Sequence, residues 1–354
     1  MAVEFDLIRD HFGRRAAAWP GPALDHPQAL GIGDDAALIR PMAPGEQLVV
    51  AVDTMVEGRH HRADVDPAAL GHKLLAVNLS DLAAMGATPL GFTLSLALRA
   101  RRHDWLEAFA EGLFGLARQT GCSLVGGDTV SLPADAPEVY TVSIYGTVPL
   151  GTALRRDGLV PGDRLWVSGS LGDASLVVAE GRSDPALDWP CPRLALGAAL
   201  RGLAHAAIDL SDGLASELGH VVAASSARRG DALQAAVDLT ALSHCLGPRL
   251  QASRASQFQA PLDKARWAAA SGDAYELLFA APPSADAALA ALSVELALPL
   301  HCIGEVLTRG DGGPPVAWLD ADGHPLGPEA SPTRGFAHFS QPDEASQQRG
   351  GHGR

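Results

Sequence analysis

Five short acidic motifs in this chain contain the residue types that a phosphate-binding magnesium site needs. Carboxylate oxygens are preferred ligands of Mg²⁺, and glycine lets a backbone approach a phosphate closely. Each motif alone is more typical of a simple turn. Together, beside glycines or at predicted strand ends, they favour a site in which metal ions hold phosphates. The motifs are Gly31–Asp35 (GIGDD), Asp53-Thr54, Ser80-Asp81, Gly126–Thr129 (GGDT) and Asp209–Gly213 (DLSDG).

Helical periodicity makes Asp81 the most informative of these residues. Asp66 is a suitable N-cap and Pro67 a suitable first residue for a helix that runs to about Gly86. At about 100° per residue, one narrow stripe of that helix carries Leu70, Leu74, Val77 and Asp81. A carboxylate on an apolar stripe must be paired, protonated or bound to a metal. The alternative is a helix that ends near Val77 and leaves Asp81 exposed.

Known nucleotide-binding motifs do not explain these residues. The segment GIGDDA at 31–36 matches GxGxxA, with Asp53 about 20 residues further on, as in dinucleotide-binding folds. However, no convincing strand precedes it, no helix-forming run follows it, and Asp34 and Asp35 would repel a bare pyrophosphate. The sequence contains neither GxxxxGK[ST] nor GxSxG, which excludes a P-loop and a nucleophile elbow.

Two pairs of adjacent side chains could contact phosphates. His60-His61 is unsuited to chelating one ion, because adjacent side chains do not converge as histidines at i and i+4 do. One of the two could contact a phosphate or a ring, or both could be solvated loop histidines. Arg155-Arg156 could bind an ATP phosphate in a bidentate manner, or could be a solvated charge pair.

Composition limits the partners and the compartment. The formal net charge of −14 argues against an extended nucleic-acid surface, so bound phosphates require local basic clusters or divalent cations. The four cysteines form no CxxC pair, and we interpret them as small buried residues in a reducing compartment. The N-terminal stretch lacks a signal-peptide apolar segment, and no run of about 18 apolar residues occurs. We expect a cytoplasmic protein without membrane or nucleic-acid partners.

Two α/β domains are expected to position the motifs, because 354 residues exceed the usual size of one domain. Each half has a strand–helix–strand–helix–strand order, which predicts an α+β or α/β two-domain fold. Turn signals and a charge cluster place the boundary within 149–162. We predict domains at 1–149 and 150–340, and a disordered polar tail at 341–354. Predicted strands include 47–52, 92–98, 122–125, 139–148 and 164–168, and a second helix is predicted at 105–120.

In this order, the motifs resemble those of the thiamine-monophosphate kinase family. The resemblance covers nearly the whole chain before the tail. The matching segments are GIGDDAAL (31–38), DTMVEGRHH (53–61), KLLAVNLSDLAAMGATP (73–89), GGDT (126–129), IDLSDGLASELGH (208–220) and SGDAYELLF (271–279). The family belongs to the same superfamily as aminoimidazole ribonucleotide synthetase. The resemblance implies an N-terminal half whose mixed sheet forms a barrel with that of a second subunit, and a C-terminal α/β sandwich.

The resemblance also assigns roles to residues that match the family's motifs. Six aspartates resemble Mg²⁺ ligands: Asp35, Asp53, Asp81, Asp128, Asp209 and Asp212. The residues that resemble ATP contacts are Gly127, Asp128, Arg156 and Ser211. Those that resemble substrate contacts are His60, Asp273 and Phe336, with Phe336 packing on the thiamine moiety.

The implied reaction is direct in-line transfer of the ATP γ-phosphoryl group to thiamine monophosphate. It is the last step of thiamine diphosphate biosynthesis. It would use several Mg²⁺ ions, ATP as co-substrate and a homodimer, without a covalent nucleophile.

Two departures from the family's pattern bear on these roles. Ala51 and Val52 stand where many members have Ser or Thr before the DT motif, so a metal contact there could use only backbone carbonyls. The stretch Gly272-Asp273-Ala274 has one carboxylate where the family commonly has an acidic pair.

Two other functions remain open at this point. One is another ATP-using member of the same superfamily, such as an aminoimidazole ribonucleotide synthetase or a selenophosphate synthetase. The latter would need a reactive Cys or selenocysteine near the N-terminus, and the first cysteine here is Cys122. A hydrogenase-maturation dehydratase would need a C-terminal Cys, whereas this chain ends His-Gly-Arg. The second is a non-catalytic nucleotide-binding relative, which only the two departures support.

Overall fold

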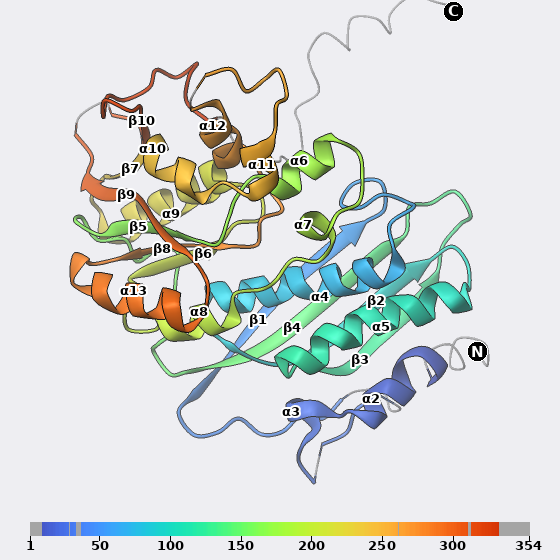
Figure 1. Ribbon diagram of the computed structural model, residues 1–354. Coiled ribbons are helices and arrows are strands. Elements are labelled where there is room, and N and C mark those ends of the chain that lie inside the picture. Colours follow the sequence, from blue (N-terminus) through green and yellow to red (C-terminus); the bar gives the residue numbers. More distant parts are fainter. Residues whose placement is uncertain (1–8, 28, 33–36, 261, 311–312, 333–354) are drawn as a thin grey trace, which may run out of the picture.

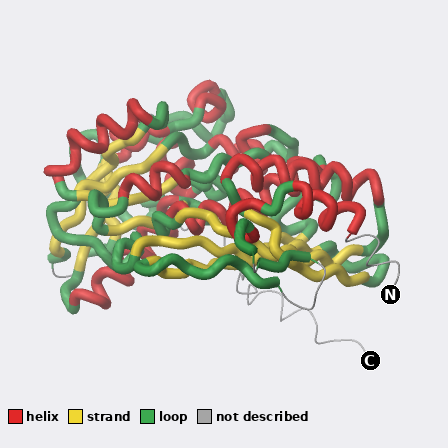
Figure 2. Tube along the Cα trace, turned by 90° about the horizontal axis from the view of Figure 1, so that it is seen from below, coloured by secondary structure: helices red, strands yellow, loops and turns green. Residues whose placement is uncertain are grey.

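The computed structural model describes residues 9–27, 29–32, 37–260, 262–310 and 313–332, and it has two α/β halves, each built on its own mixed sheet (Figure 1). In Figure 2, which is turned by 90° from Figure 1, the strands form a layer through the molecule and helices pack on it. In the described part of the chain, no helix is both long and apolar enough to cross a membrane.

The N-terminal half contains a four-stranded sheet of order β1-β4-β2-β3, so that β1 and β3 are its edges. Strand β4 is antiparallel to both of its neighbours, and β2 is parallel to β3. Its main elements are β1 (Glu46–Val56), α4 (Pro67–Ala84), β2 (Thr88–Leu98), α5 (His103–Thr120), β3 (Ser123–Ser131) and β4 (Val139–Pro149). A π-helical turn (Arg9–Gly13) and the short helices α2 (Arg14–Ala18) and α3 (Gly21–Leu24) precede them.

Helix α4 is buried along most of its length, which explains why apolar residues dominate its sequence. Asp66 caps its N-terminus by accepting hydrogen bonds from the backbone N–H groups of Ala68 (2.7 Å) and Ala69 (3.3 Å), and Pro67 is its first residue. The helix continues to Ala84, past Asp81. The predicted start and extent are therefore confirmed, and the alternative end near Val77 is wrong.

The C-terminal half contains a six-stranded sheet of order β10-β7-β9-β5-β8-β6. Only the β10–β7 pair is parallel. The strands are β5 (Arg164–Ser168), β6 (Ala206–Asp209), β7 (Leu233–Asp238), β8 (Leu277–Ala281), β9 (Leu300–Thr308) and β10 (Val316–Leu319). The α-helices are α6 (Asp173–Ala179), α7 (Pro185–Asp188), α8 (Leu194–Leu200), α9 (Leu214–Arg229), α10 (Leu239–Leu242), α11 (Pro248–Ala252), α12 (Asp263–Ala270) and α13 (Asp286–Glu295). Short 3₁₀ turns lie at Ser243–Cys245 and Pro283–Ala285.

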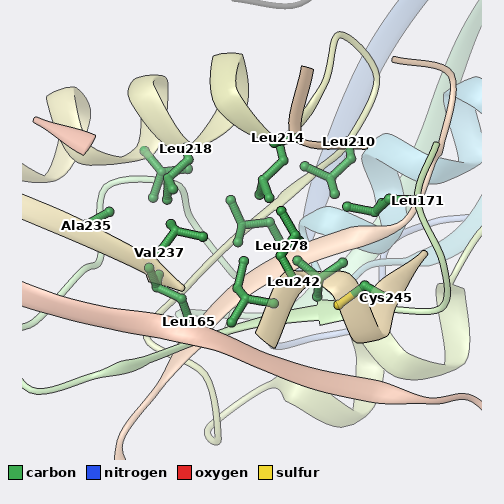
Figure 3. Close-up of a cluster of buried hydrophobic side chains, with 14 of the residues drawn as sticks. Leu165, Leu171, Leu210, Leu214, Leu218, Ala235, Val237, Leu242, Cys245 and Leu278 are labelled. Carbon is green, nitrogen blue, oxygen red and sulfur yellow. The ribbon is translucent and has the colours of Figure 1, made fainter. Parts of the chain in front are cut away.

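Each half has its own hydrophobic core, and a third cluster joins them. In the N-terminal half, α4 and α5 pack on the sheet around Phe92, Phe109 and Phe114. In the C-terminal half, leucines of α9 such as Leu214 and Leu218 pack on the sheet (Figure 3). The third cluster combines Ala83 and Ala84 of α4 with residues of α8, β8 and α13. Helix α4 is thus the element through which the halves pack together.

Two of the acidic motifs lie inside strands and not at strand ends as predicted. Asp53 is an internal residue of β1, and the GGDT motif lies within β3, which continues to Ser131. The two-part α/β architecture with mixed sheets is confirmed. The predicted tail at 341–354 lies outside the described residues.

Candidate active site

A cavity of about 880 Å³ lies between the two halves and is lined by both. The N-terminal half contributes residues of β1, the turn at 58–62 and one face of α4. The C-terminal half contributes the turns at 209–212 and 270–275 and the segment 175–188. Because α4 carries side chains into the cavity and also packs against the C-terminal half, its position determines how the two sets of residues meet.

Four carboxylates line one end of this cavity. Asp53 comes from β1 and Asp81 from α4, whereas Asp209 ends β6 and Asp212 follows in the turn before α9. These four predicted residues, far apart in sequence, are therefore brought together.

Burial and mutual repulsion raise the pKa values of three of these carboxylates. Burial raises the pKa of Asp81 to about 8, and the charges of Asp209 and Asp53 add to the effect while Arg156 opposes it. Burial, with the charges of Asp209 and Asp212, raises the pKa of Asp53 to about 6. Burial also raises the pKa of Asp209, although a hydrogen bond from Ser80 acts in the opposite direction. Such a cluster favours a bound cation, which would remove the repulsion.

Buried polar residues of α4 orient two of the carboxylates. The Ser80 hydroxyl donates to Asp209 Oδ2 over 2.8 Å, which links the two halves directly. The side-chain oxygen of Asn78 accepts from the backbone N–H of Asp53 (3.0 Å), and its amide nitrogen donates to the carbonyl of Leu74 (2.9 Å). Both Ser80 and Asn78 are fully buried, so these bonds are shielded from competing water.

The turn that carries Asp212 is held by Glu217 in the first turn of α9. Glu217 Oε1 accepts from the backbone N–H of Asp212 (2.8 Å) and, at 3.4 Å, from the Ser211 hydroxyl. Burial raises the pKa of Glu217 to about 7. Its Oε2 is buried and has no hydrogen-bond partner among the described residues. Glu217 therefore fixes the backbone of the turn that carries Asp212.

The other end of the cavity combines apolar and basic side chains. Val65, Leu70 and Leu187 are among its apolar lining residues. Its cations are Lys73, Arg59, Arg62 and Arg182. Lys73 pairs with Asp273, and Arg62 pairs with Asp64 over 2.7 Å and donates to the carbonyl of Gly181. An organic molecule that carries a phosphate could extend from this end to the acidic one.

Of the other residues predicted to contact ATP or the substrate, three line the cavity and Arg156 is exposed. His60 lines the cavity, and its Nδ1 accepts from the backbone N–H of Val56 over 3.0 Å. Ser211 and Asp273 also line it. Arg156 is exposed, close enough to Asp81 and Asp209 to lower the pKa of both. Its neighbour Arg155 pairs with Asp157 over 2.6 Å.

Gly127 and Asp128 are not part of this cavity in the single chain. Both are exposed on β3, and the Asp128 carboxylate accepts a hydrogen bond from the backbone N–H of Thr129 over 2.8 Å. Strand β3 is the sheet edge opposite β1, which carries Asp53. Asp35 and Phe336 lie outside the described residues.

A second group of potential metal ligands lies outside the cavity. Among the described residues, three ligand atoms of metal-binding type lie within 4.8 Å of one another only at Asp320, Asp322 and His324, in the exposed turn after β10. The cavity carboxylates are spaced more widely than that.

The sequence motifs assigned no role to Lys73, Asn78, Ser80 or Glu217, and Ser80 was named only as the neighbour of Asp81. The first three lie inside the matched segment 73–89, and Glu217 lies inside 208–220. For the three residues of α4, the available signal was a polar side chain within a helix that is otherwise apolar, as for Asp81.

Comparison with known proteins identifies the family. A family model described as AIR synthase related protein, N-terminal domain, matches residues 33–148. Thiamine-monophosphate kinase of Escherichia coli (strain K12) is 38% identical over 352 residues, which cover 96% of this chain and 99% of that protein. The chain belongs to the thiamine-monophosphate kinase family.

Solved structures place the fold with this family. The crystal structure of thiamine-monophosphate kinase from Stenotrophomonas maltophilia K279a matches with a TM-score of 0.75 and 38% identity, over 90% of this chain and 97% of that one. A structure described as AaThiL complexed with AMPPCP and TMP matches with a TM-score of 0.68 over 87% of this chain and 92% of that one. At 24% identity, the second likeness is one of fold. The resemblance to thiamine-monophosphate kinases seen in the sequence is confirmed.

Proposed function

We propose that this protein transfers the γ-phosphoryl group of ATP to the phosphate of thiamine monophosphate and so forms thiamine diphosphate. The observation that carries the proposal is 38% identity to thiamine-monophosphate kinase over 96% of the chain. The cavity supports it, because one end offers carboxylates for metal-bound phosphates and the other offers apolar surface for an organic ring. The AaThiL structure, of the same fold, holds AMPPCP and TMP.

Mg²⁺ fits the acidic end of the cavity. Asp53, Asp81, Asp209 and Asp212 supply the hard oxygen ligands that this ion prefers. The raised pKa values of Asp53, Asp81 and Asp209 reflect burial and, secondly, a repulsion between carboxylates that a cation relieves. When bound, Mg²⁺ would neutralise phosphate charge and align the attacking and leaving oxygens. We propose Asp35 and Asp128 as further ligands.

The residues of the chain itself act chiefly by positioning. The acceptor phosphate is largely ionised at neutral pH, so a strong general base is unnecessary. Transfer is direct and in line, without a covalent enzyme intermediate. Asn78, Ser80 and Glu217 hold the backbone or side chains of the acidic cluster in place. We assign Gly127, Asp128, Arg156 and Ser211 to ATP, and His60, Asp273 and Phe336 to the acceptor.

We also propose that the protein is a homodimer whose N-terminal sheets pair to form a barrel. Both edge strands expose apolar side chains: on β1, Leu48, Val50 and Val52 are 45%, 58% and 60% exposed, and on β3, Val130 is 48% exposed. Apolar edge strands are prone to pairing with another chain. The cysteines of the described chain are free, which suits the reducing cytoplasm that we propose as its compartment.

A coupled assay tests the reaction. Purified protein, ATP and Mg²⁺ are incubated with thiamine monophosphate or with thiamine, and thiamine diphosphate is quantified. We expect product from the monophosphate alone. A folded, ATP-binding protein that forms no product from either acceptor would instead be a superfamily relative with another acceptor, or a non-catalytic one.

A further inference from the structure

Lys73 is a buried cation to which none of the motif assignments gives a role. The residue is 5% exposed, and it lines the cavity from α4 with Val77 and Asp81 following at intervals of one turn. Burying an ammonium group is costly unless the group is paired. The partner is Asp273 of the C-terminal half, with Lys73 Nζ 2.7 Å from Asp273 Oδ1. The ion pair therefore crosses the cavity between the halves.

Lysine is a rare residue in this chain. Lys73 and Lys264 are the only lysines among the 27 basic Lys and Arg residues of the chain. A lysine ammonium is a compact charge, whereas a guanidinium is a planar fork that would engage both carboxylate oxygens. Lysine therefore suits a contact that must use one oxygen of Asp273 and leave the other.

The contacts on Asp273 are confined to one of its oxygens. Lys73 Nζ and, at 3.5 Å, the Tyr275 hydroxyl both reach Oδ1. No residue that the structure describes donates a hydrogen bond to Oδ2, and the Asp273 side chain is 35% exposed where it lines the cavity. Oδ2 is thus the carboxylate oxygen that a bound molecule can reach.

The backbone of Asp273 is fixed as firmly as its side chain. Asp273 and Tyr275 adopt positive φ angles of 59° and 50°, a costly conformation that clusters at functional sites. The N–H of Asp273 donates to the carbonyl of Ser211 (2.7 Å), and that of Tyr275 to the carbonyl of Leu210 (2.8 Å). These bonds attach the turn at 272–275 to the turn that carries Asp209 and Asp212.

The position of the pair along α4 points to the acceptor and not to ATP. Lys73 lies two helical turns, about 12 Å along the helix axis, from Asp81. Its neighbours in the cavity lining toward the start of α4 are Leu70 and Ala69. Thiamine monophosphate carries a positively charged thiazolium ring next to its phosphate arm and an aminopyrimidine ring at the far end, and both the cationic ring and the amino group are attracted to a carboxylate oxygen.

We propose that Lys73 is a positioning residue for the acceptor: it holds Asp273 Oδ1 and thereby presents Oδ2 to the cationic ring and amino group of thiamine monophosphate. This rests on the proposed function. Because residue 274 is alanine, Asp273 is the one carboxylate in the turn 272–275, so the acceptor contact depends on this single ion pair.

A double-mutant cycle tests the proposal with Lys73→Met, Asp273→Asn and the two combined. Met keeps the length of the side chain without its charge, and Asn tolerates a positive φ. We expect each single variant to raise the KM for thiamine monophosphate roughly tenfold, as for loss of a charged hydrogen bond, and to leave the KM for ATP within about twofold. The double variant should resemble Asp273→Asn alone, because Lys73 acts through Asp273. Lys264→Met, outside the cavity, is the matched control and should behave as wild type.

Three results would overturn the proposal. Multiplicative effects of the two substitutions would mean that Lys73 acts independently of Asp273. An equal rise in both KM values, or a lowered melting temperature with unchanged KM values, would make the pair merely structural. The wild-type protein in the same assay tests the proposed function separately. If it forms no thiamine diphosphate, that function fails, and calorimetric titration with thiamine monophosphate still compares the affinities of the four proteins.

Discussion

Among single residues, the cavity carboxylates make the stability of the metal-free protein depend on pH. The folded-state pKa values of Asp53 and Asp81, about 6 and about 8, exceed the ordinary aspartate value of 3.8. At pH values between the ordinary aspartate pKa and these raised pKa values, the folded state binds protons that the unfolded state has lost. The stability of the folded state therefore falls as pH rises through this range. The contribution is fully present below about pH 4 and is lost as pH rises through about 6 and then about 8.

We therefore predict that the melting temperature in EDTA falls between about pH 5.5 and 8.5, and that Mg²⁺ raises it more at the upper pH than at the lower. Differential scanning calorimetry at both pH values, with and without Mg²⁺, measures this. A melting temperature that rises toward pH 8.5 in EDTA would contradict the raised pKa values.

Replacing Asp81 by Asn should separate activity from folding. The variant removes a metal ligand, so we expect turnover to fall by on the order of 100-fold or more. It also removes a buried charge, so in EDTA at high pH its melting temperature should equal or exceed that of the wild type. Steady-state kinetics at saturating Mg²⁺ and a melting curve check both parts. Asp231→Asn, in an exposed turn, is the control. Normal turnover of Asp81→Asn would refute the ligand assignment.

The sequence could predict some site residues because their signal is local. Asp81 follows from helical periodicity, since a carboxylate on an apolar stripe is visible within four turns. Lys73 lies on a neighbouring part of the same helix, but its role depends on Asp273, 200 positions away. Glu217 escaped notice because a glutamate in the first turn of a helix is ordinary, and only burial beneath Asp212 makes it informative.

Among elements, the position of α4 depends on two glycines where it meets α5. A Cβ atom on Gly71 of α4 would lie 2.1 Å from the carbonyl oxygen of Phe109 in α5. Reciprocally, a Cβ atom on Gly112 of α5 would lie 1.8 Å from the carbonyl oxygen of Ala68 in α4. The two backbones therefore approach more closely than any other residue would allow.

We predict that Gly112→Ala destabilises the protein by about 1–3 kcal/mol, because the helices must separate. Gly115→Ala, on the same helix but with open space around its Cβ position, should stabilise the protein by about 0.5–1 kcal/mol. Urea unfolding of both variants gives the comparison. Equal effects of the two substitutions would show that helix propensity alone governs α5, contrary to the close approach.

Element types followed from local patterns, whereas element ends did not. The strand predicted at 122–125 continues to Ser131 because β2 offers parallel partners from Thr93 to Leu98. The glycines of the GGDT motif have low strand propensity, so only that long-range pairing extends the strand. Likewise β1 runs past Asp53 to Val56 because β4 pairs with it along its whole length.

At the scale of the whole molecule, the strand order separates Asp128 from the cavity carboxylates. The family resemblance assigns all of them to the binding of Mg²⁺. Thr54, Thr141, Ser95 and Asp128 form one row across the N-terminal sheet. Asp128 is therefore level with Thr54, the residue next to Asp53, but three strand spacings away, about 14 Å. If β3 of a second copy paired with β1, it would bring Asp128 of the partner subunit beside Asp53 and Thr54. The proposed dimer would then complete each site with a residue from the other chain.

Mixing two inactive variants tests this arrangement. Asp81→Asn and Asp128→Asn should each be inactive alone, because every site then lacks one carboxylate. In a mixed dimer that shares residues in this way, one site lacks both carboxylates and the other has both. With random pairing, half of the dimers are mixed and half of their sites are complete, so co-expression should restore up to about a quarter of wild-type activity. Sedimentation of the mixture establishes that dimers form. Two inactive variants that form mixed dimers without recovering activity would place Asp128 in the site of its own chain, and the edge pairing of β1 with β3 would have to be abandoned.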